Sequence, residues 1–208
     1  MAKRKVSNLL ALAVLSYLTQ RPMHPYEMQR NLRENDAART FKLSYGSLYT
    51  VVRQLATAGF IEAQATSREG NLPERTVYQL TAAGRSEMVD WLRQLVAEPQ
   101  QEHSAFVAAL SLIVVLPPDE AVSLLKSRLD LLAAECEGIR QTIDRTTASG
   151  VHPIFLVEDE YRLAMAAAEA EFIQQFIENV TRSGSGWAEP WAAFHSNQAS
   201  PATGGEEK

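Results

Sequence analysis

The sequence predicts a mainly helical protein with one small pair of β-strands. Apolar residues recur at helical spacing through most of its length, and two short β-rich runs surround a turn that contains glycine and proline. A polar segment, EPQQE at residues 98–102, interrupts the helical pattern and predicts a hinge. Of the 208 residues, 46% are hydrophobic, so the chain can bury a sizeable core in one or two domains.

The first half of the sequence predicts three helices in succession. Residues 7–20 carry a wide apolar stripe, and Pro25 suits the first turn of a second helix. A third helix is expected to begin after Ser44, a good N-cap, and to run to Ala58. Gly59 then supplies the left-handed residue that ends many helices.

The third helix has two chemically different faces. Arg53 can donate two hydrogen bonds to a guanine edge or a phosphate, Thr50 offers a hydroxyl or a methyl group, and Gly46 permits close backbone approach. Such a face favours DNA recognition, although a Ser-capped helix with small polar residues is also common in structural roles. The apolar stripe comprises Leu48, Val51, Val52 and Leu55, and the outward set comprises Gly46, Tyr49, Thr50, Arg53 and Thr57.

A β-hairpin is expected directly after the third helix. Its strands cover 60–66 and 76–80, and its turn is flanked by the basic residues Arg68 and Arg75. Thr81 caps a further helix. Three helices followed by a two-stranded wing predict a winged helix-turn-helix domain over residues 1–97.

Charge is divided unevenly between the two halves of the chain. The overall net charge of −5 would argue against a nucleic-acid partner if it were spread evenly. Residues 1–95 hold 13 Lys and Arg against 8 Asp and Glu, whereas residues 96–208 hold 7 against 17. A DNA-binding face is therefore confined to the N-terminal half. The basic residues Lys3, Arg4 and Lys5 suit an arm at the phosphate backbone, or equally a solvated terminus.

The second half predicts a helical dimerisation domain over residues 103–182. Helical patterns cover about 103–115, 119–147 and 155–181. Apolar stripes on helices of this length cannot all be buried on a small winged helix, so a second copy of the chain is the natural partner. Cys136, the single cysteine, falls on the apolar stripe and is read as a small core residue.

Residues 183–208 are rich in Ser, Gly, Pro and Ala, which predicts a flexible tail. Trp187 and Trp191, four residues apart, leave open a short docking turn within this tail.

Several short segments carry a family resemblance: PYEM at 25–28, LSYGSLY at 43–49 and VYQLTAAG at 77–84 in the first half, and FVAAL at 106–110 and LPPDEA at 116–121 in the second. In order and spacing, the N-terminal segments resemble those of the PadR transcriptional regulators. The C-terminal segments resemble, more loosely, the longer members of that family with a helical domain of the virulence-regulator type. The resemblance implies a winged helix-turn-helix that binds DNA and C-terminal helices that build a homodimer.

These observations together predict an effector-responsive repressor that binds a palindromic operator in double-stranded DNA as a homodimer. The alternative is a helical protein-interaction module whose winged helix docks a protein. Trp91 and Phe106 are weak candidates for a small-molecule effector pocket. The expected DNA-binding residues are Lys3, Arg4, Lys5, Lys42, Ser44, Tyr45, Gly46, Ser47, Tyr49, Thr50, Arg53, Arg68 and Arg75.

The sequence lacks the usual signatures of catalysis and metal binding. It contains no nucleophile elbow, phosphate-binding loop, HExxH motif or CxxC pair, and its four histidines have no partner at helical spacing. We therefore expect no enzyme activity, no cofactor and no metal. The most apolar run, 106–116, is too short to cross a bilayer, and no signal peptide is recognised, which predicts a cytoplasmic protein.

Overall fold

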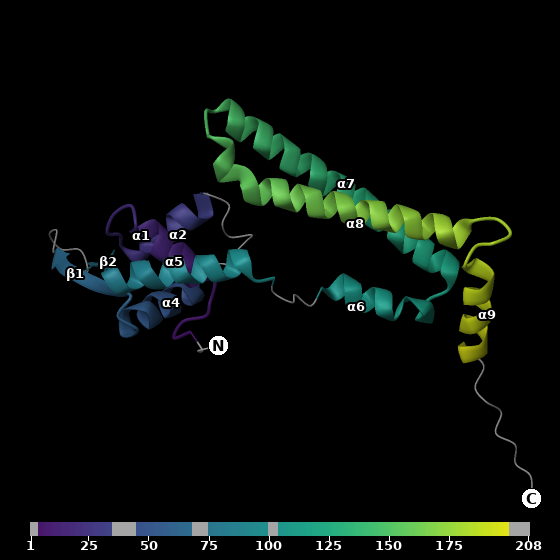
Figure 1. Ribbon diagram of the computed structural model, residues 1–208, viewed down its shortest axis with the longest axis horizontal. Coiled ribbons are helices and arrows are strands. Elements are labelled where there is room, and N and C mark those ends of the chain that lie inside the picture. The colour runs from purple at the N-terminus through teal and green to yellow at the C-terminus, as the bar shows by residue number, and fades with distance from the viewer. Residues whose placement is uncertain (1–3, 35–44, 68–74, 100–103, 200–208) are drawn as a thin grey trace, which may run out of the picture. The chain divides into compact units, whose positions relative to one another are not determined.

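The computed structural model shows two compact units, residues 1–101 and 102–208, each with apolar clusters of its own. Figure 1 shows the order of helices and strands along the chain. The mainly helical fold with one β-hairpin, predicted from the sequence, is confirmed. The residues that the structure describes are 4–34, 45–67, 75–99 and 104–199.

Helix α1 forms the centre of the N-terminal unit. Seven of its nine residues are buried, because α2, α4 and α5 all pack against it. Met28 and Leu32 of α2 and Leu55 of α4 complete this apolar core. The elements of the unit are α1 (Leu10–Leu18), α2 (Pro25–Glu34), α4 (Tyr45–Thr57), β1 (Ile61–Ser67), β2 (Arg75–Leu80) and α5 (Ala82–Ala97).

The two strands form an antiparallel hairpin that is anchored at its base. Ile61 lies opposite Leu80, and the register shifts between Gln64 and Ser67. Tyr78 of β2 also exchanges two backbone hydrogen bonds with Met23, each 3.0 Å long. Hydrogen bonds therefore join the two strands to each other and join the hairpin to the segment that precedes α2.

The start of α5 packs directly on the end of α4 and the start of β1. The Thr81 hydroxyl accepts a hydrogen bond from the Gly84 N–H at 3.0 Å, which caps α5, and lies 2.8 Å from the Gly59 carbonyl oxygen. A Cβ atom at Gly84 would overlap the carbonyl group of Phe60, so only glycine allows this approach. Gly59 itself has a φ of 77°, as expected for the residue after the third helix.

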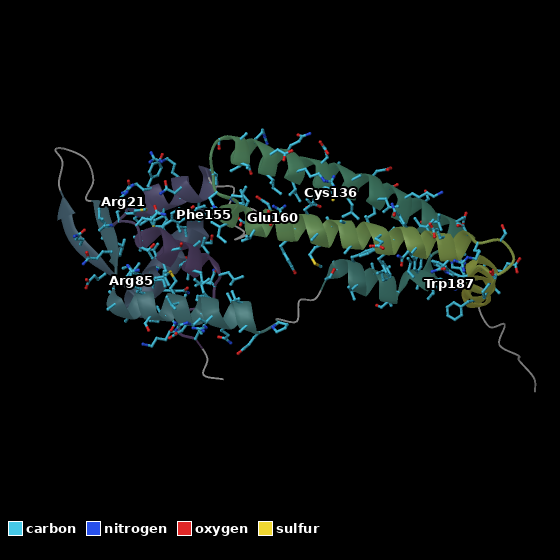
Figure 2. The ribbon with its side chains drawn as sticks, turned by 45° about the horizontal axis from the view of Figure 1, so that its top comes forward. Arg21, Arg85, Cys136, Phe155, Glu160 and Trp187 are labelled. Carbon is cyan, nitrogen blue, oxygen red and sulfur yellow. The ribbon has the colours of Figure 1, made fainter. Side chains whose placement is uncertain are left out.

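The C-terminal unit is built on a long antiparallel helix pair, α7 and α8 (Figure 1). Leu125 and Leu132 of α7 pack with Ile173 of α8, and an ion pair of 2.6 Å joins Arg128 to Glu169 across the pair. Cys136 is buried on α7, where Figure 2 labels it. The elements are α6 (Ala105–Ser111), η1 (Ile113–Val115), α7 (Pro118–Ala148), η2 (Pro153–Leu156), α8 (Val157–Thr181) and α9 (Ala188–Ala199).

The structure differs from the expected flexible tail over residues 188–199, which form helix α9. The Trp191 ring is buried, and its indole N–H donates a hydrogen bond of 3.0 Å to the Leu116 carbonyl oxygen. Trp187, at the junction of α8 and α9 in Figure 2, meets Phe176 edge to face. The docking turn left open by the two tryptophans is therefore a docked helix.

Candidate nucleic-acid interface

Helix α4 has the two faces expected of a recognition helix. Its apolar stripe is buried to 2% exposure or less in the core of the N-terminal unit. Gly46, Thr50, Arg53 and Thr57 are exposed on the opposite side, while Ser47 and Tyr49 are half-buried. Burial of one face fixes the orientation of the helix, so the other is held outward as a small polar surface.

Arg53 stands between two open hollows on this surface. One is lined by the N-terminal segment and the C-terminal half of α4, and includes Lys5, Asn8 and Gln54. The other lies between α4, the start of α2 and strand β2, and includes His24 and Tyr78. Among the described residues, Arg53 is not paired with a carboxylate, so its guanidinium remains available to a ligand.

Sequence reasoning missed the residues that share the second hollow with Arg53. His24, Thr76 and Tyr78 reach it from segments more than 20 residues away in the chain. No local pattern could reveal them, because tertiary contacts such as the pairing of Tyr78 with Met23 bring these segments together.

The first turn of α2, beside this hollow, is held by Glu27. Its carboxylate accepts hydrogen bonds from Arg21 Nη2 at 3.0 Å and from the His24 N–H at 3.1 Å. The hydrogen bond from Arg21, and after it that from His24, holds the pKa of Glu27 below its usual range. A negative charge is favourable at this end of a helix, so Glu27 stabilises the turn that carries His24.

The basic N-terminal segment contains two residues with different surroundings. Arg4 pairs with Glu87 at 2.6 Å, donates a hydrogen bond of 2.7 Å to Gln94, and lies 5.4 Å from the centre of the Trp91 ring. Lys5 is exposed, with its ammonium group 5.9 Å from the centre of the Phe60 ring. Lys5 is free to meet a phosphate, whereas Arg4 already has three partners on the domain.

The remaining expected DNA-binding residues are placed only in part. Tyr45 begins α4 and Arg75 begins β2, and the structure describes the backbone of both. Lys3, Lys42, Ser44 and Arg68 lie outside the described residues. Their assignment to DNA stays a prediction.

The two effector-pocket candidates are engaged inside different units. Trp91 is 5% exposed in the core of the N-terminal unit, where Arg4 covers its ring. Phe106 packs at the α7–α8 cluster, and the Arg128 guanidinium lies 3.8 Å from the centre of its ring. A ligand that contacted either ring would have to displace packing already present.

No group of three or more His, Cys, Asp or Glu side chains in the part of the chain that the structure describes could hold a metal ion. None of the described helices is both long enough and apolar enough to cross a bilayer.

Residues 14–90, which include most of the winged-helix unit, match the family described as "Transcriptional regulator PadR-like family". The chain carries a PadR-like domain. The resemblance of this region to PadR regulators, predicted from the sequence, is therefore confirmed.

A curated relative and several solved structures extend the PadR-like similarity beyond this domain. The negative transcriptional regulator PadR of Bacillus subtilis is 24% identical over 141 residues, which is 68% of this chain and 76% of the relative. Its crystal structure with operator DNA has a TM-score of 0.65 at 20% identity and covers 81% of this chain and 97% of that one. Its structure with p-coumaric acid has a TM-score of 0.66 at 17% identity and covers 86% and 97%. A PadR-like regulator from Bacillus cereus has a TM-score of 0.58 at 19% identity and covers 81% and 95%.

Proposed function

We propose that the protein is a sequence-specific repressor that binds a palindromic operator as a homodimer and releases it when a small-molecule effector binds. The observation that carries the proposal is the outward face of α4. Arg53, Thr50 and Gly46 are exposed there, opposite a face that is fully buried. This arrangement suits a helix that enters the major groove and reads base edges.

The charge of the N-terminal unit supports a DNA partner. Its excess of Lys and Arg contrasts with the acidic C-terminal half, so attraction to phosphates is expected at the N-terminal unit, which carries α4. The B. subtilis relative is a negative regulator and has been crystallised with operator DNA. In the proposal, Lys5 and the wing residues Arg68 and Arg75 contact phosphates, which position the helix without reading sequence.

We expect tight, salt-sensitive binding to the DNA upstream of the protein's own gene. Binding to that duplex and to a shuffled duplex of the same composition should be measured by fluorescence anisotropy across a salt series. The affinity should fall steeply with salt for both duplexes, by about 0.9 logarithmic units per phosphate contact for each tenfold rise in salt. The upstream duplex should bind more tightly at every salt concentration. A footprint should show inverted half-sites with centres about 10 bp apart or a multiple of it.

The alternative, a winged helix that docks a protein, predicts a different result. Neither duplex would then bind with a steep salt dependence. A preference for the upstream duplex that survives at the highest usable salt separates operator recognition from general attraction between charges.

The helical unit supports a second copy of the chain as a partner. Helix α8 has two apolar sides, and only one packs on α7. The other forms a stripe of four large side chains that are each between 47% and 66% exposed: Val157, Tyr161, Met165 and Phe172. Exposed stripes of this kind mark contact surfaces, and a two-fold axis would let two copies cover each other.

Placing a charge on this stripe should therefore dissociate the homodimer. We expect Met165→Asp to shift the mass measured by light scattering from two chains towards one at micromolar concentration, because the new carboxylate would be buried without a partner. Gln174→Asp adds the same charge to an exposed position of α8 outside the stripe and should leave the dimer intact. A wild-type chain that is monomeric at this concentration would contradict the proposed homodimer.

The B. subtilis relative has been crystallised with p-coumaric acid, and this chain offers Trp91 and Phe106 as aromatic candidates for a comparable role. Because both rings are covered by arginines, an effector that used them would have to move Arg4 or Arg128. Ligand binding would then disrupt the contacts that Arg4 or Arg128 makes.

A further inference from the structure

The side chain of Arg4 holds the N-terminal segment against α5. We propose that Arg4 is a positioning residue for DNA binding: it does not contact DNA itself but holds Lys5 beside Arg53 of the recognition helix, where Lys5 can contact a phosphate. This inference rests on the proposed function. It reassigns Arg4, which the sequence placed among the phosphate contacts.

Three contacts occupy the Arg4 guanidinium. Nη1 pairs with Glu87 at 2.6 Å, Nη2 donates to Gln94 Oε1 at 2.7 Å, and the group lies over the Trp91 ring. The side chains of Arg4 and Glu87 are only 20% and 24% exposed. Contact with a phosphate would require breaking these interactions, so Arg4 is more useful as an anchor than as a DNA ligand.

The segment after Arg4 is also held in place. Val6 is 5% exposed in the core of the unit, and the Asn8 side chain accepts a hydrogen bond of 3.0 Å from the Leu10 N–H at the start of α1. Lys5 lies between these fixed points and remains exposed. Its position is therefore set by its neighbours, which reduces the entropy that a loose basic arm would lose on docking.

One hollow is lined by two cations, one from the anchored segment and one from α4. Lys5 and Arg53 both line it, together with Ser7, Asn8 and Thr57, and no carboxylate lines it among the residues that the structure describes. A phosphodiester of bound DNA seated there would contact Lys5 and several polar side chains and would lie near the positive charge of Arg53, whose guanidinium can still reach a base edge. The contacts of Arg4 with α5 thus hold the segment that forms one side of a phosphate site. The recognition helix forms the other side.

Two carboxylates on α5 allow this role to be separated from simple electrostatics. Glu87 holds Arg4, whereas Asp90 pairs with the exposed Arg93 at 3.0 Å. Removing either carboxylate makes the domain more positive by the same amount, which by itself should tighten DNA binding slightly. If Glu87 anchors the arm, its removal should instead weaken binding.

We therefore expect Glu87→Ala to bind DNA about two- to fivefold more weakly than Asp90→Ala in the full-length protein, on specific and shuffled duplexes alike. The salt dependence of Glu87→Ala should be shallower by about 0.9 units, because the Lys5 contact is lost. Lys5→Ala should show the same change in the wild type and no further change in Glu87→Ala. Equal or tighter binding by Glu87→Ala, with an unchanged salt dependence, would overturn the positioning role.

Proteolysis of the DNA-free protein tests independently whether Glu87 holds the N-terminal segment through Arg4. Trypsin should remove residues 1–5 faster from Glu87→Ala than from Asp90→Ala or the wild type, as followed by mass spectrometry, because the released arm can enter the protease. Equal rates of cleavage in the three proteins would show that Glu87 does not hold the segment, whatever the DNA-binding result. A wild-type chain that does not bind DNA would overturn the proposed function and the phosphate role of Lys5, while the trypsin rates would still decide whether Glu87 holds the arm.

Discussion

Arg53→Ala should weaken operator binding by about 1–3 kcal/mol per site, the largest loss expected from any single truncation on α4. Arg53 is exposed on the outward face and stands between the two hollows. A guanidinium in that position can form two parallel hydrogen bonds with a guanine edge, and no alanine contact replaces them. Anisotropy titrations with operator and shuffled duplexes measure the loss.

Two further variants show what kind of contact Arg53 makes. Arg53→Lys keeps the charge but loses the planar pair of donors, so sequence preference should fall while the salt dependence stays near the wild-type value. Arg93→Ala removes an exposed arginine from α5 of the same unit and should leave sequence preference unchanged. Wild-type affinity and preference in Arg53→Ala would show that α4 does not enter the groove as proposed.

Trp191→Ala should destabilise the helical unit by about 3–5 kcal/mol, the range for truncating a buried aromatic side chain. Trp191 is 7% exposed, packs with Val122 of α7 and Val180 of α8, and donates a hydrogen bond to the Leu116 carbonyl. Its removal leaves a cavity and an unpaired carbonyl where α9 meets the end of the helix pair. Urea unfolding at one fixed protein concentration measures the change, because the stability of a dimer depends on concentration.

Matched variants separate packing from hydrogen bonding at this site. Trp191→Phe keeps most of the ring and removes the N–H donor, so it should cost less than Trp191→Ala, with about 0.5–1.5 kcal/mol from the hydrogen bond. Trp187→Ala truncates a ring that is 48% exposed and should also have a smaller effect. A Trp191→Ala variant as stable as Trp187→Ala would mean that α9 does not contribute to the core of the unit.

The N-terminal unit could be predicted well because its signals are local. A helix ends at Gly59 because a glycine there adopts positive φ, and a helix begins after Thr81 because its hydroxyl caps the Gly84 N–H. Each signal lies within a few residues of the boundary that it sets. The buried stripe of α4 follows in the same way from helical spacing within one segment.

The C-terminal segment could not be predicted from composition, because its stability comes from distant residues. Trp191 is fixed by Leu116, 75 positions earlier in the chain. Gly184 and Gly186 made the segment resemble a linker, although Gly184 has a φ of 77° and a Cβ at Gly186 would overlap the backbone of the turn. The useful signal was the pair of tryptophans four residues apart, Trp187 and Trp191, which is the spacing of neighbours on one helix face.

The contacts of Arg4 also could not be predicted from the sequence, because its partners are distant in the chain. A basic residue near the N-terminus resembles any other in the sequence, and only the fold brings Glu87 and Gln94 within reach of it. Lys5, the next residue, remains exposed. Neighbouring cations can therefore have different roles, one in anchoring the segment and one in meeting a ligand.

The burial of one indole ring in each unit gives the protein two built-in fluorescent reporters. Trp91 lies in the apolar core of the N-terminal unit, and Trp191 lies in a cluster of the helical unit. Tryptophan emission moves to longer wavelengths when the ring enters water, so the loss of each core changes the emission of its own ring. With Trp187 replaced by Phe, and either Trp91 or Trp191 replaced in turn, the remaining ring reports on one unit alone. Coincident transitions would show that the two units melt as one cooperative body, and separate transitions would show that they melt independently.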